Sequence, residues 1–411
     1  MKTNSNQNVV FLTYDGLLDP LGGSQILPYL KGISNHTNAV HVLSFEKAHR
    51  ISDKGRSLAR ELDKLNISWT PLIFSSQYGI FGKILDLIKF FIFSFYICVK
   101  NKINIIHARG LPSAVIGGLP KLFLNISLIF DFRGLWVDER VDKGGWDLKR
   151  YMHRLQYNIF KKLERILLSM SDEVIVLTNT VVDEVCRLGK ISPSKVTVIP
   201  CCADYDFFKI PHRSEVYEIR KRLNIPQDAI VIGYLGSAGG MYITRSYIEL
   251  LNSIGNLSKD FIALVITPDK EKFQVLINQH LHSDLRPQVI LHSANREDVP
   301  SYLAAFNCIV NFTFPSYARL SMSPTKLAEC FATGIPMICN SGVGDVDENV
   351  KTLDGGLVIP DISKNSLLTA AKYILTSRRQ PSERLRNSSR LIFGLEVARK
   401  RYRNVYSRLK E

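Results

Sequence analysis

The sequence of 411 residues lacks several features that would assign a protein to a class directly. Its seven cysteines include no CxxC pair and mostly lie in apolar contexts, which indicates reduced, buried thiols in a cytoplasmic protein. No long apolar segment occurs in residues 1–16, so we expect no secretion signal. Zinc-finger spacing, helix-turn-helix cues and basic repeats with interleaved aromatics are missing too, so a nucleic acid is not the expected partner.

A long apolar run is also lacking. The best candidate for a membrane segment, residues 79–102, has an uninterrupted apolar core over 90–99 that is about half as long as a span requires. Lys83, Asp86 and Lys89 interrupt the part before it. A helix buried in the core is favoured, and a helix that lies at a membrane surface is the alternative.

What the chain has in excess is positive charge. Lys and Arg number 53 against 38 Asp and Glu, a formal net charge of +15 at pH 7. This excess favours an anionic partner, such as a phosphorylated ligand or an anionic lipid surface. The densest basic run, residues 377–411, is most simply a solvated helix face. The length favours two domains, and an apolar content of 45% suffices for two cores.

Short apolar runs alternate with helical patterns along the whole chain, which predicts an α/β protein with parallel sheets. A polar linker over 204–215 separates two Rossmann-like halves, so the cleft between them is the expected ligand site. The expected strands are 8–14, 39–45, 103–109, 126–132, 173–178, 196–201, 229–236, 261–267, 288–293, 308–314 and 335–340.

Each half begins with a strand that runs into a glycine-rich loop. In "DPLGGSQ", Gly22 and Gly23 would allow positive φ and close approach of a ligand, and Ser24 is a candidate N-cap for the next helix. In "GYLGSAGG", Gly236 and Ser237 offer a second backbone cradle. An ordinary strand-to-helix turn explains the first loop equally well, and the second fits neither the dinucleotide-binding nor the Walker pattern.

A cluster of charged and aromatic residues lies in "IFDFRGLWVDERVDKGGW", residues 129–146. Asp131 and Arg133 follow a strand, and Glu139 comes a few residues later between Trp136 and Trp146. Carboxylates beside tryptophans suit a sugar, because its rings stack on the indoles and its hydroxyls donate to the carboxylates. An internal network of ion pairs is the alternative.

The stretch "SMSPTKLAECFATGIPMICN" predicts a helix over 324–333, with Ser323 as N-cap and Gly334 as the stop. The start of such a helix attracts a phosphate, and Lys326 in the first turn adds positive charge. Glu329 lies on the same side of the helix as Lys326 and is suited to accept the two ribose hydroxyls of a nucleotide. A solvated surface helix is the alternative.

These segments in this order resemble the GT-B-fold retaining glycosyltransferases, the large family of bacterial sucrose and glycogen synthases and of many polysaccharide enzymes. The resemblance covers nearly the whole chain. It implies two Rossmann-like domains facing across a cleft, with 1–208 on the acceptor side, 209–380 binding the nucleotide sugar, and a helix in 381–411 that returns to the first domain. It is carried by "YDGLLDPLGGSQ", "IHAR", "DFRGLWVDERVDKGGW", "VIPCCADYDFF" and "SPTKLAECFATGIPMICNSGVGDVD".

The resemblance implies transfer of a sugar from a nucleoside-diphosphate sugar to a saccharide or lipid-linked acceptor, with retention of configuration, in cell-surface polysaccharide synthesis. No metal or cofactor is expected, because protein cations and helix ends neutralise the departing diphosphate. Asp131, Arg133 and Glu139 are expected to bind the acceptor or the donor sugar. The residues expected to bind the donor are Gly22, Gly23, Gly236, Ser237, Arg245, Arg319, Ser321, Ser323, Thr325, Lys326 and Glu329.

Two departures from the family pattern accompany the resemblance. Ser321 occupies the position of the first of two glutamates spaced eight positions apart. The usual arginine and lysine after the first strand of the second domain are also not evident, and Arg245, Arg319 or Lys326 are candidates to replace that charge. The alternatives are a sugar-nucleotide epimerase on the same scaffold and a catalytically inactive partner of another glycosyltransferase. Contact of residues 84–99 with an anionic inner membrane face is a separate expectation.

Overall fold

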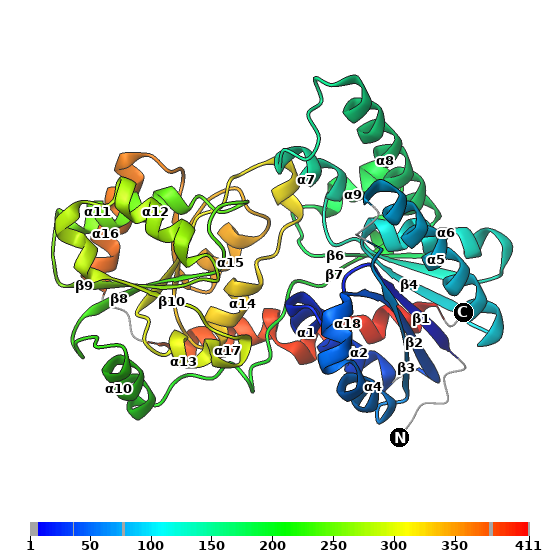
Figure 1. Ribbon diagram of the computed structural model, residues 1–411, viewed down its shortest axis with the longest axis horizontal. Helices are drawn as coiled ribbons and strands as arrows, with labels where there is room; N and C mark the ends of the chain where they lie inside the picture. Colours follow the sequence, from blue (N-terminus) through cyan, green and yellow to red (C-terminus); the bar gives the residue numbers. More distant parts are fainter. Residues whose placement is uncertain (1–6, 36, 76–78, 378–380, 410–411) are drawn as a thin grey trace. The chain divides into compact units, whose positions relative to one another are not determined.

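The computed structural model describes residues 7–35, 37–75, 79–377 and 381–409, and the chain divides into two compact units (Figure 1). The first unit comprises Met1–Pro200 and Leu395–Glu411, and the second comprises Cys201–Gly394. The chain therefore enters the second unit earlier than the predicted boundary at 208 and leaves it later than the predicted one at 380. The early entry has a structural reason, because the N–H of Ala203 donates to the carbonyl of Phe393 at 3.0 Å.

A seven-stranded parallel sheet with the order β3-β2-β1-β4-β5-β6-β7 forms the centre of the first unit. In Figure 1, α5, α6, α8 and α9 cover one face of it, and α2, α4 and α18 lie on the other. The strands are β1 Asn8–Thr13, β2 Ala39–Glu46, β3 Ile67–Ile73, β4 Ile105–Arg109, β5 Ser127–Asp131, β6 Glu173–Val176 and β7 Val196–Val198. The helices are α1 Pro20–Gln25, α2 Leu27–Ser34, α3 Ala48–Arg50, α4 Arg56–Asp63, α5 Gly79–Lys100, α6 Gly110–Phe123, α7 Trp136–Asp142, α8 Tyr151–Met170, α9 Val182–Gly189 and α18 Leu395–Arg408.

The second unit contains a six-stranded parallel sheet with the order β10-β9-β8-β11-β12-β13. One buried cluster around Phe331 and Phe393 packs on one face, and another around Tyr247 and Phe273 packs on the other. The strands are β8 Ile230–Leu235, β9 Phe261–Ile266, β10 Val289–His292, β11 Cys308–Asn311, β12 Met337–Asn340 and β13 Gly356–Ile359. The helices are α10 Arg213–Arg222, α11 Thr244–Gly255, α12 Lys270–His280, α13 Val299–Leu303, α14 Thr325–Ala332, α15 Val346–Thr352, α16 Lys364–Ser377 and α17 Glu383–Phe393.

The predicted α/β class and parallel sheets are confirmed, and every predicted strand is present. Two strands escaped prediction, and both lie at sheet edges. In the sequence of β3, Pro71 argues against a strand, but an edge strand tolerates a residue without an N–H. In β13, the strand is short and begins at Gly356, whose φ is +137°. Edge strands carry the weakest apolar pattern, so they are the hardest to predict.

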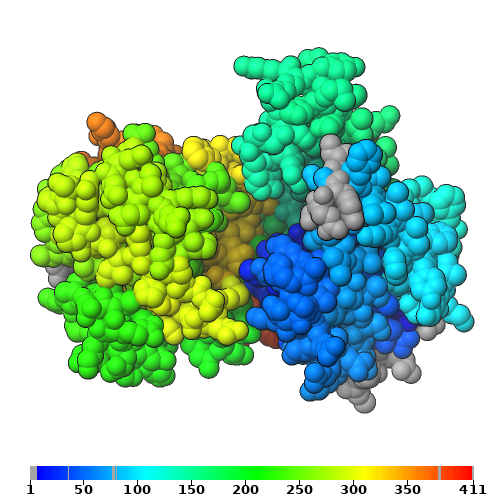
Figure 2. Space-filling view, viewed as in Figure 1, coloured from blue at the N-terminus to red at the C-terminus, as the bar shows by residue number. Residues whose placement is uncertain are grey.

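Helix α5, which spans the membrane candidate, is buried on one face only. Phe90, Ile97 and Cys98 point into the core, so the prediction of a buried helix holds for that face. None of the helices in the described part of the chain combines the length and hydropathy needed to cross a membrane. The exposed large apolar residues of α5 are Phe81, Ile84, Leu85, Leu87, Ile88, Ile92, Phe93, Tyr96 and Val99. In Figure 2, the segment that contains α7 and α8 protrudes from the first unit, to which α5 also belongs.

Candidate functional site

The polar loops of the second unit converge at the carboxyl edge of its sheet. Strands β8, β11 and β12 are parallel neighbours, so the loops that follow them leave from one edge. The loop after β11 leads through a 3₁₀ turn, Tyr317–Ser321, into α14. The loop after β12 contacts that turn, since the N–H of Gly344 donates to the carbonyl of Arg319 at 2.9 Å. The start of α14 therefore lies among these loops.

Lys326 in the first turn of α14 reaches back to the glycine loop after β8. Gly236 has a φ of +128°, and a Cβ added to it would lie 2.3 Å from the Nζ of Lys326. The same Nζ lies 3.7 Å from the ring centroid of Tyr242. Only glycine combines that backbone conformation with so close an approach of the lysine. The fold thus places the predicted lysine against the predicted glycine loop.

Glu329 lies one turn further along α14 and is 4% exposed. Its Oε1 forms an ion pair with the Nη2 of Arg296 at 2.8 Å. Burial raises the pKa of Glu329, and the charges of Arg296 and Lys326 oppose that rise. Arg296 comes from the turn Arg296–Asp298 before α13 and stacks on Phe208, whose ring centroid is 5.5 Å away. No sequence pattern identified Arg296, because its partner lies on a different element.

The other predicted donor residues of the second unit differ in their surroundings. Arg319 and Ser321 are buried in the turn before α14, and the Ser321 hydroxyl donates to the carbonyl of Ala318 at 2.8 Å. The Ser237 carbonyl accepts a hydrogen bond from the Tyr234 hydroxyl at 2.8 Å. Arg319 and Ser321 thus lie inside the buried turn that leads into α14.

Arg245 and Thr325 lie at helix starts. Arg245 lies in the first turn of α11, where it pairs with Glu249 at 2.9 Å and remains largely exposed. Thr325 is the first residue of α14 and is half-buried. The structure therefore gives Arg245 a partner on its own helix and places Thr325 beside Lys326.

Two predicted helix caps are wrong. The N-cap of α14 is Pro324, and the hydroxyl of Ser323 instead accepts the N–H of Cys201 at 3.1 Å. Ser24 lies inside α1, and its hydroxyl donates to the carbonyl of Pro20 at 3.0 Å. The Ser24 hydroxyl is thus bonded to a nearby carbonyl, and the Ser323 hydroxyl to an N–H far away in the sequence. Neither hydroxyl caps a helix. The predicted stop at residue 334 is confirmed by a φ of +74°.

The first glycine pair does not form the predicted loop. Gly22 and Gly23 lie in α1, and neither has a positive φ. A Cβ at Gly22 would lie 2.2 Å from the carbonyl oxygen of Gly16, so its close contact is with its own backbone. A Cβ at Gly23 would have no atom within 4 Å. Only Gly23 therefore leaves open space for a ligand.

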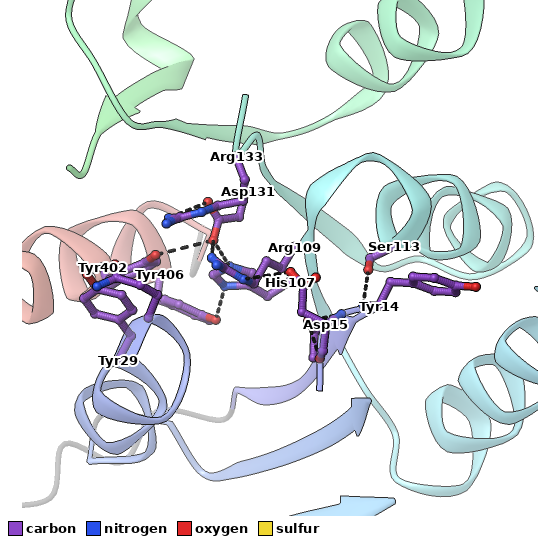
Figure 3. Close-up of polar contacts among 12 residues, drawn as sticks. Tyr14, Asp15, Tyr29, His107, Arg109, Ser113, Asp131, Arg133, Tyr402 and Tyr406 are labelled. Carbon is purple, nitrogen blue, oxygen red and sulfur yellow. Dashed lines mark hydrogen bonds and ion pairs between the residues drawn. The ribbon is translucent and has the colours of Figure 1, made fainter. Parts of the chain in front are cut away.

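A second polar cluster lies at the carboxyl edge of the first unit's sheet, around Asp131 (Figure 3). Asp131 ends β5 and is 1% exposed. Its carboxylate lies 3.5 Å from the Nη1 of Arg133, 3.6 Å from the Nη1 of Arg109 and 3.5 Å from the Nε2 of His107. Burial favours the protonated acid, but Arg133, His107 and Arg109 together hold the pKa of Asp131 below its ordinary value.

Helix α18 closes this cluster with two tyrosines. The Tyr406 hydroxyl lies 2.7 Å from the Nδ1 of His107, and the Tyr402 hydroxyl donates to Asp131 at 3.4 Å. Figure 3 shows both rings reaching the cluster from α18. Burial lowers the pKa of His107, so its ring is neutral near pH 7. The C-terminal helix is thus part of the cluster's support.

The aromatic part of residues 129–146 forms a separate group. Trp136 and Trp146 meet edge to face with ring centroids 5.9 Å apart, and Phe160 of α8 packs on both. Glu139 lies on α7 and pairs with Lys143 at 2.8 Å. The structure therefore joins Asp131 with Arg133 in an ion pair, the arrangement given above as the alternative to a sugar site, and it pairs Glu139 with Lys143. His107 and Arg109, which complete the cluster, lie in the "IHAR" stretch.

Two parallel α/β units, with polar residues at the carboxyl edge of each sheet and a C-terminal helix that belongs to the first unit, define the GT-B class of glycosyltransferases. Family models agree with this class. The model of glycosyltransferase family 4 matches residues 31–207, and the model of glycosyl transferases group 1 matches residues 215–391. The chain belongs to this family of glycosyltransferases.

Solved structures share the fold over the whole chain. A glycosyltransferase from Rickettsia africae is 15% identical, with 98% of each chain covered and a TM-score of 0.69. An Anabaena protein solved with UDP and glucose is 13% identical, covering 98% of this chain and 100% of that one at a TM-score of 0.70. Sucrose-phosphate synthase from Thermosynechococcus elongatus is 17% identical, covering 98% and 99% at a TM-score of 0.68. A comparison with curated proteins finds no match.

Proposed function

We propose that this glycosyltransferase moves a sugar from a nucleoside-diphosphate sugar to a saccharide or lipid-linked saccharide acceptor, with retention of configuration, in cell-surface polysaccharide synthesis. The observation that carries the proposal is the start of α14 beside the loop after β8, where the Nζ of Lys326 lies close to Gly236 and Glu329 follows one turn later. There the start of α14 and Lys326 bind the diphosphate, and Glu329 accepts the ribose hydroxyls. The Anabaena relative solved with UDP and glucose supports a donor of this class.

The chemistry follows from the positive charges at the start of α14. The bond between the anomeric carbon and the diphosphate oxygen breaks, and a bond from that carbon to the acceptor oxygen forms. Lys326 and Arg319 stabilise the negative charge on the leaving diphosphate, so the proposed reaction requires no metal or cofactor. The acceptor proton passes to a leaving phosphate oxygen on the same face of the sugar. This route requires no protein base. We expect Ser321, which stands where the family pattern has a glutamate that contacts the donor sugar, to affect which sugar is bound.

We assign a supporting role in this reaction to the cluster of the first unit. The carboxylate of Asp131 faces Arg133, Arg109 and His107, whereas the side chain of Arg133 is 14% exposed. In the proposed reaction Arg133 contacts the acceptor or the donor sugar, and Asp131 fixes its guanidinium. Glu139, with its side chain 30% exposed, remains a candidate acceptor ligand.

The experiment measures nucleotide release by purified protein with UDP-, GDP-, ADP- and CMP-sugars and a lipid-linked saccharide extract. We expect one donor to be consumed, and Lys326→Ala to lower the rate by about a hundredfold or more, because it removes a charge that acts on the leaving group. Lys259→Ala is the matched control, since this lysine is 53% exposed and pairs with Asp284. Release from no donor, or equal rates in both variants, would contradict the proposal.

Because the proposed acceptor is lipid-linked, we also propose that the protein contacts an anionic membrane through α5. The exposed apolar residues of α5 continue onto the end of α6, which packs beside it and exposes Leu122 and Phe123. Lys83 and Lys100 are exposed on α5, whereas its acid, Asp86, is buried and accepts the N–H of Ser75. Apolar residues flanked by cations suit an anionic bilayer surface.

Co-sedimentation with vesicles tests this contact. We expect binding to vesicles that contain phosphatidylglycerol, weaker binding at high salt, and loss of binding on Ile92→Glu, which places a charge in the apolar face. Val275→Glu is the control, because Val275 is similarly exposed on α12 of the other unit. If the wild-type protein does not bind these vesicles, the membrane contact is ruled out, and the proposed donor chemistry is unaffected.

A further inference from the structure

We propose that Arg296 is a positioning residue for the donor: it holds the carboxylate of Glu329 ionised and oriented to accept the ribose hydroxyls. This inference rests on the proposed function, because it assigns the ribose to Glu329. It concerns a residue outside the glycine loops and outside α14. The geometry that carries it is the ion pair of 2.8 Å between the two side chains.

Arg296 is itself held in place. Its guanidinium lies over the ring of Phe208, which is fully buried, at 5.5 Å from the ring centroid. The side chain is 39% exposed, so one side of the guanidinium faces solvent while Glu329 is 5% exposed. A planar cation fixed on an aromatic ring loses less freedom on pairing than a mobile lysine. Arg296 thus presents a preformed partner to a buried acid.

The charged and titratable groups around Glu329 are few in the described chain. Lys326 lies on the same side of α14, and Cys330 follows next in the helix with a thiol whose pKa is raised by burial. Helix α17 packs on α14 and brings Arg386, but its guanidinium donates to the carbonyl of Ala332. Arg296 is the cation in direct contact with Glu329. A buried carboxylate that loses this contact takes up a proton more readily.

The protonation state matters because a carboxylate accepts from both ribose hydroxyls, whereas a neutral acid keeps one oxygen as a donor. The test therefore compares UDP, or the nucleoside diphosphate that binds best, with its 2′,3′-dideoxy analogue. Wild-type protein is expected to prefer the ribose form about tenfold or more between pH 6 and pH 8, since hydrogen bonds to a charged group are lost with the hydroxyls. In Arg296→Gln this preference is expected to shrink, and to shrink further as the pH falls.

The dideoxy analogue separates positioning from direct contact. If Arg296 acts through Glu329, Arg296→Gln binds the dideoxy analogue nearly as well as wild type does, and Arg296→Lys restores part of the ribose preference. Arg222→Gln is the matched control, because Arg222 is exposed and also stacks on a ring, that of Tyr302. An equal loss for both nucleotides at every pH, or an unchanged ribose preference in Arg296→Gln, would overturn the inference.

A double-mutant cycle without nucleotide completes the test. Thermal unfolding of Arg296→Gln, Glu329→Gln and the double variant is expected to show coupling between the two residues that weakens as Glu329 is protonated. Absence of coupling at pH 8 overturns the inference even if no nucleotide binds. If the two residues are coupled but the wild-type protein binds none of the nucleotides, the proposed function is refuted, and with it the role of Glu329 in binding the ribose. The two failures are therefore distinguishable.

Discussion

The two units each place a buried carboxylate beside an arginine at the carboxyl edge of a parallel sheet, and yet the two acids differ. Asp131 faces Arg133, Arg109 and His107, and its pKa is held below the ordinary value. Glu329 contacts one arginine, and burial raises its pKa. Burial raises the pKa of both acids, and the number of facing cations decides whether the pKa ends above or below its ordinary value.

This difference separates two roles. An acid surrounded by cations has its oxygens engaged by the protein, so Asp131 organises the side chains around it. Glu329, with one arginine beside it and the charge of Lys326 nearby, retains capacity for a ligand in the proposed reaction.

The largest effect is expected for Asp131→Asn. It removes the buried negative charge that faces Arg109 and Arg133, which destabilises by about 3–5 kcal/mol. Denaturant unfolding measures the change. Glu61→Gln is the control within the same unit, since its ion pair with Lys31 is exposed and contributes at most about 1 kcal/mol. Equal losses in the two variants would mean that the cations around Asp131 are not held by its charge.

Gly236→Ala is expected to lower the transfer rate by about a hundredfold, because the new methyl group displaces Lys326 and a small displacement at a reacting centre has that effect. Steady-state kinetics with the best donor measures it. Gly240→Ala is the matched control: Gly240 also has a positive φ, +68°, but a Cβ there would meet no atom within 4 Å. A comparable loss in Gly240→Ala would assign the effect to backbone strain.

The pH dependence of stability is expected to have opposite signs in the two units. Asp131 has a lowered pKa, so its contribution is present above the ordinary pKa and is lost as the pH falls below it. Glu329 has a raised pKa, so the native state takes up its proton first, and stability rises as the pH falls towards the ordinary value. Calorimetry of Asp131→Asn and Glu329→Gln against wild type from pH 7 to pH 3 measures both slopes. Slopes of one sign would remove the distinction.

The smallest effect is expected for Tyr406→Phe, which removes one hydrogen bond to His107 and costs about 1 kcal/mol. Thermal unfolding measures it. Tyr151→Phe is expected to change nothing, because Tyr151 is 68% exposed on α8. A null result for Tyr406→Phe would show that the Tyr406 hydroxyl contributes no net stability to the cluster.

Much of the fold was predictable because burial on both faces leaves continuous apolar runs, which the central strands of both sheets carry. The exceptions, β3 and β13, lie at edges where burial is partial. The incorrectly predicted caps at Ser24 and Ser323 show that single hydrogen bonds, like edge strands, are hard to predict from the sequence. A hydroxyl that can cap a helix can equally bond a carbonyl or a distant N–H, and only the fold selects between them.

By itself, the sequence determined the α/β class, the order of the strands along the chain, the stop after α14, and the side on which Lys326 and Glu329 lie. These properties depend on neighbouring residues and on the periods of helix and strand. The tertiary structure alone decided which charges meet. Arg109 stands beside Asp131 because the parallel register pairs them, and Arg296 reaches Glu329 from another element. Electrostatic energies depend on distance in space, which local sequence does not encode.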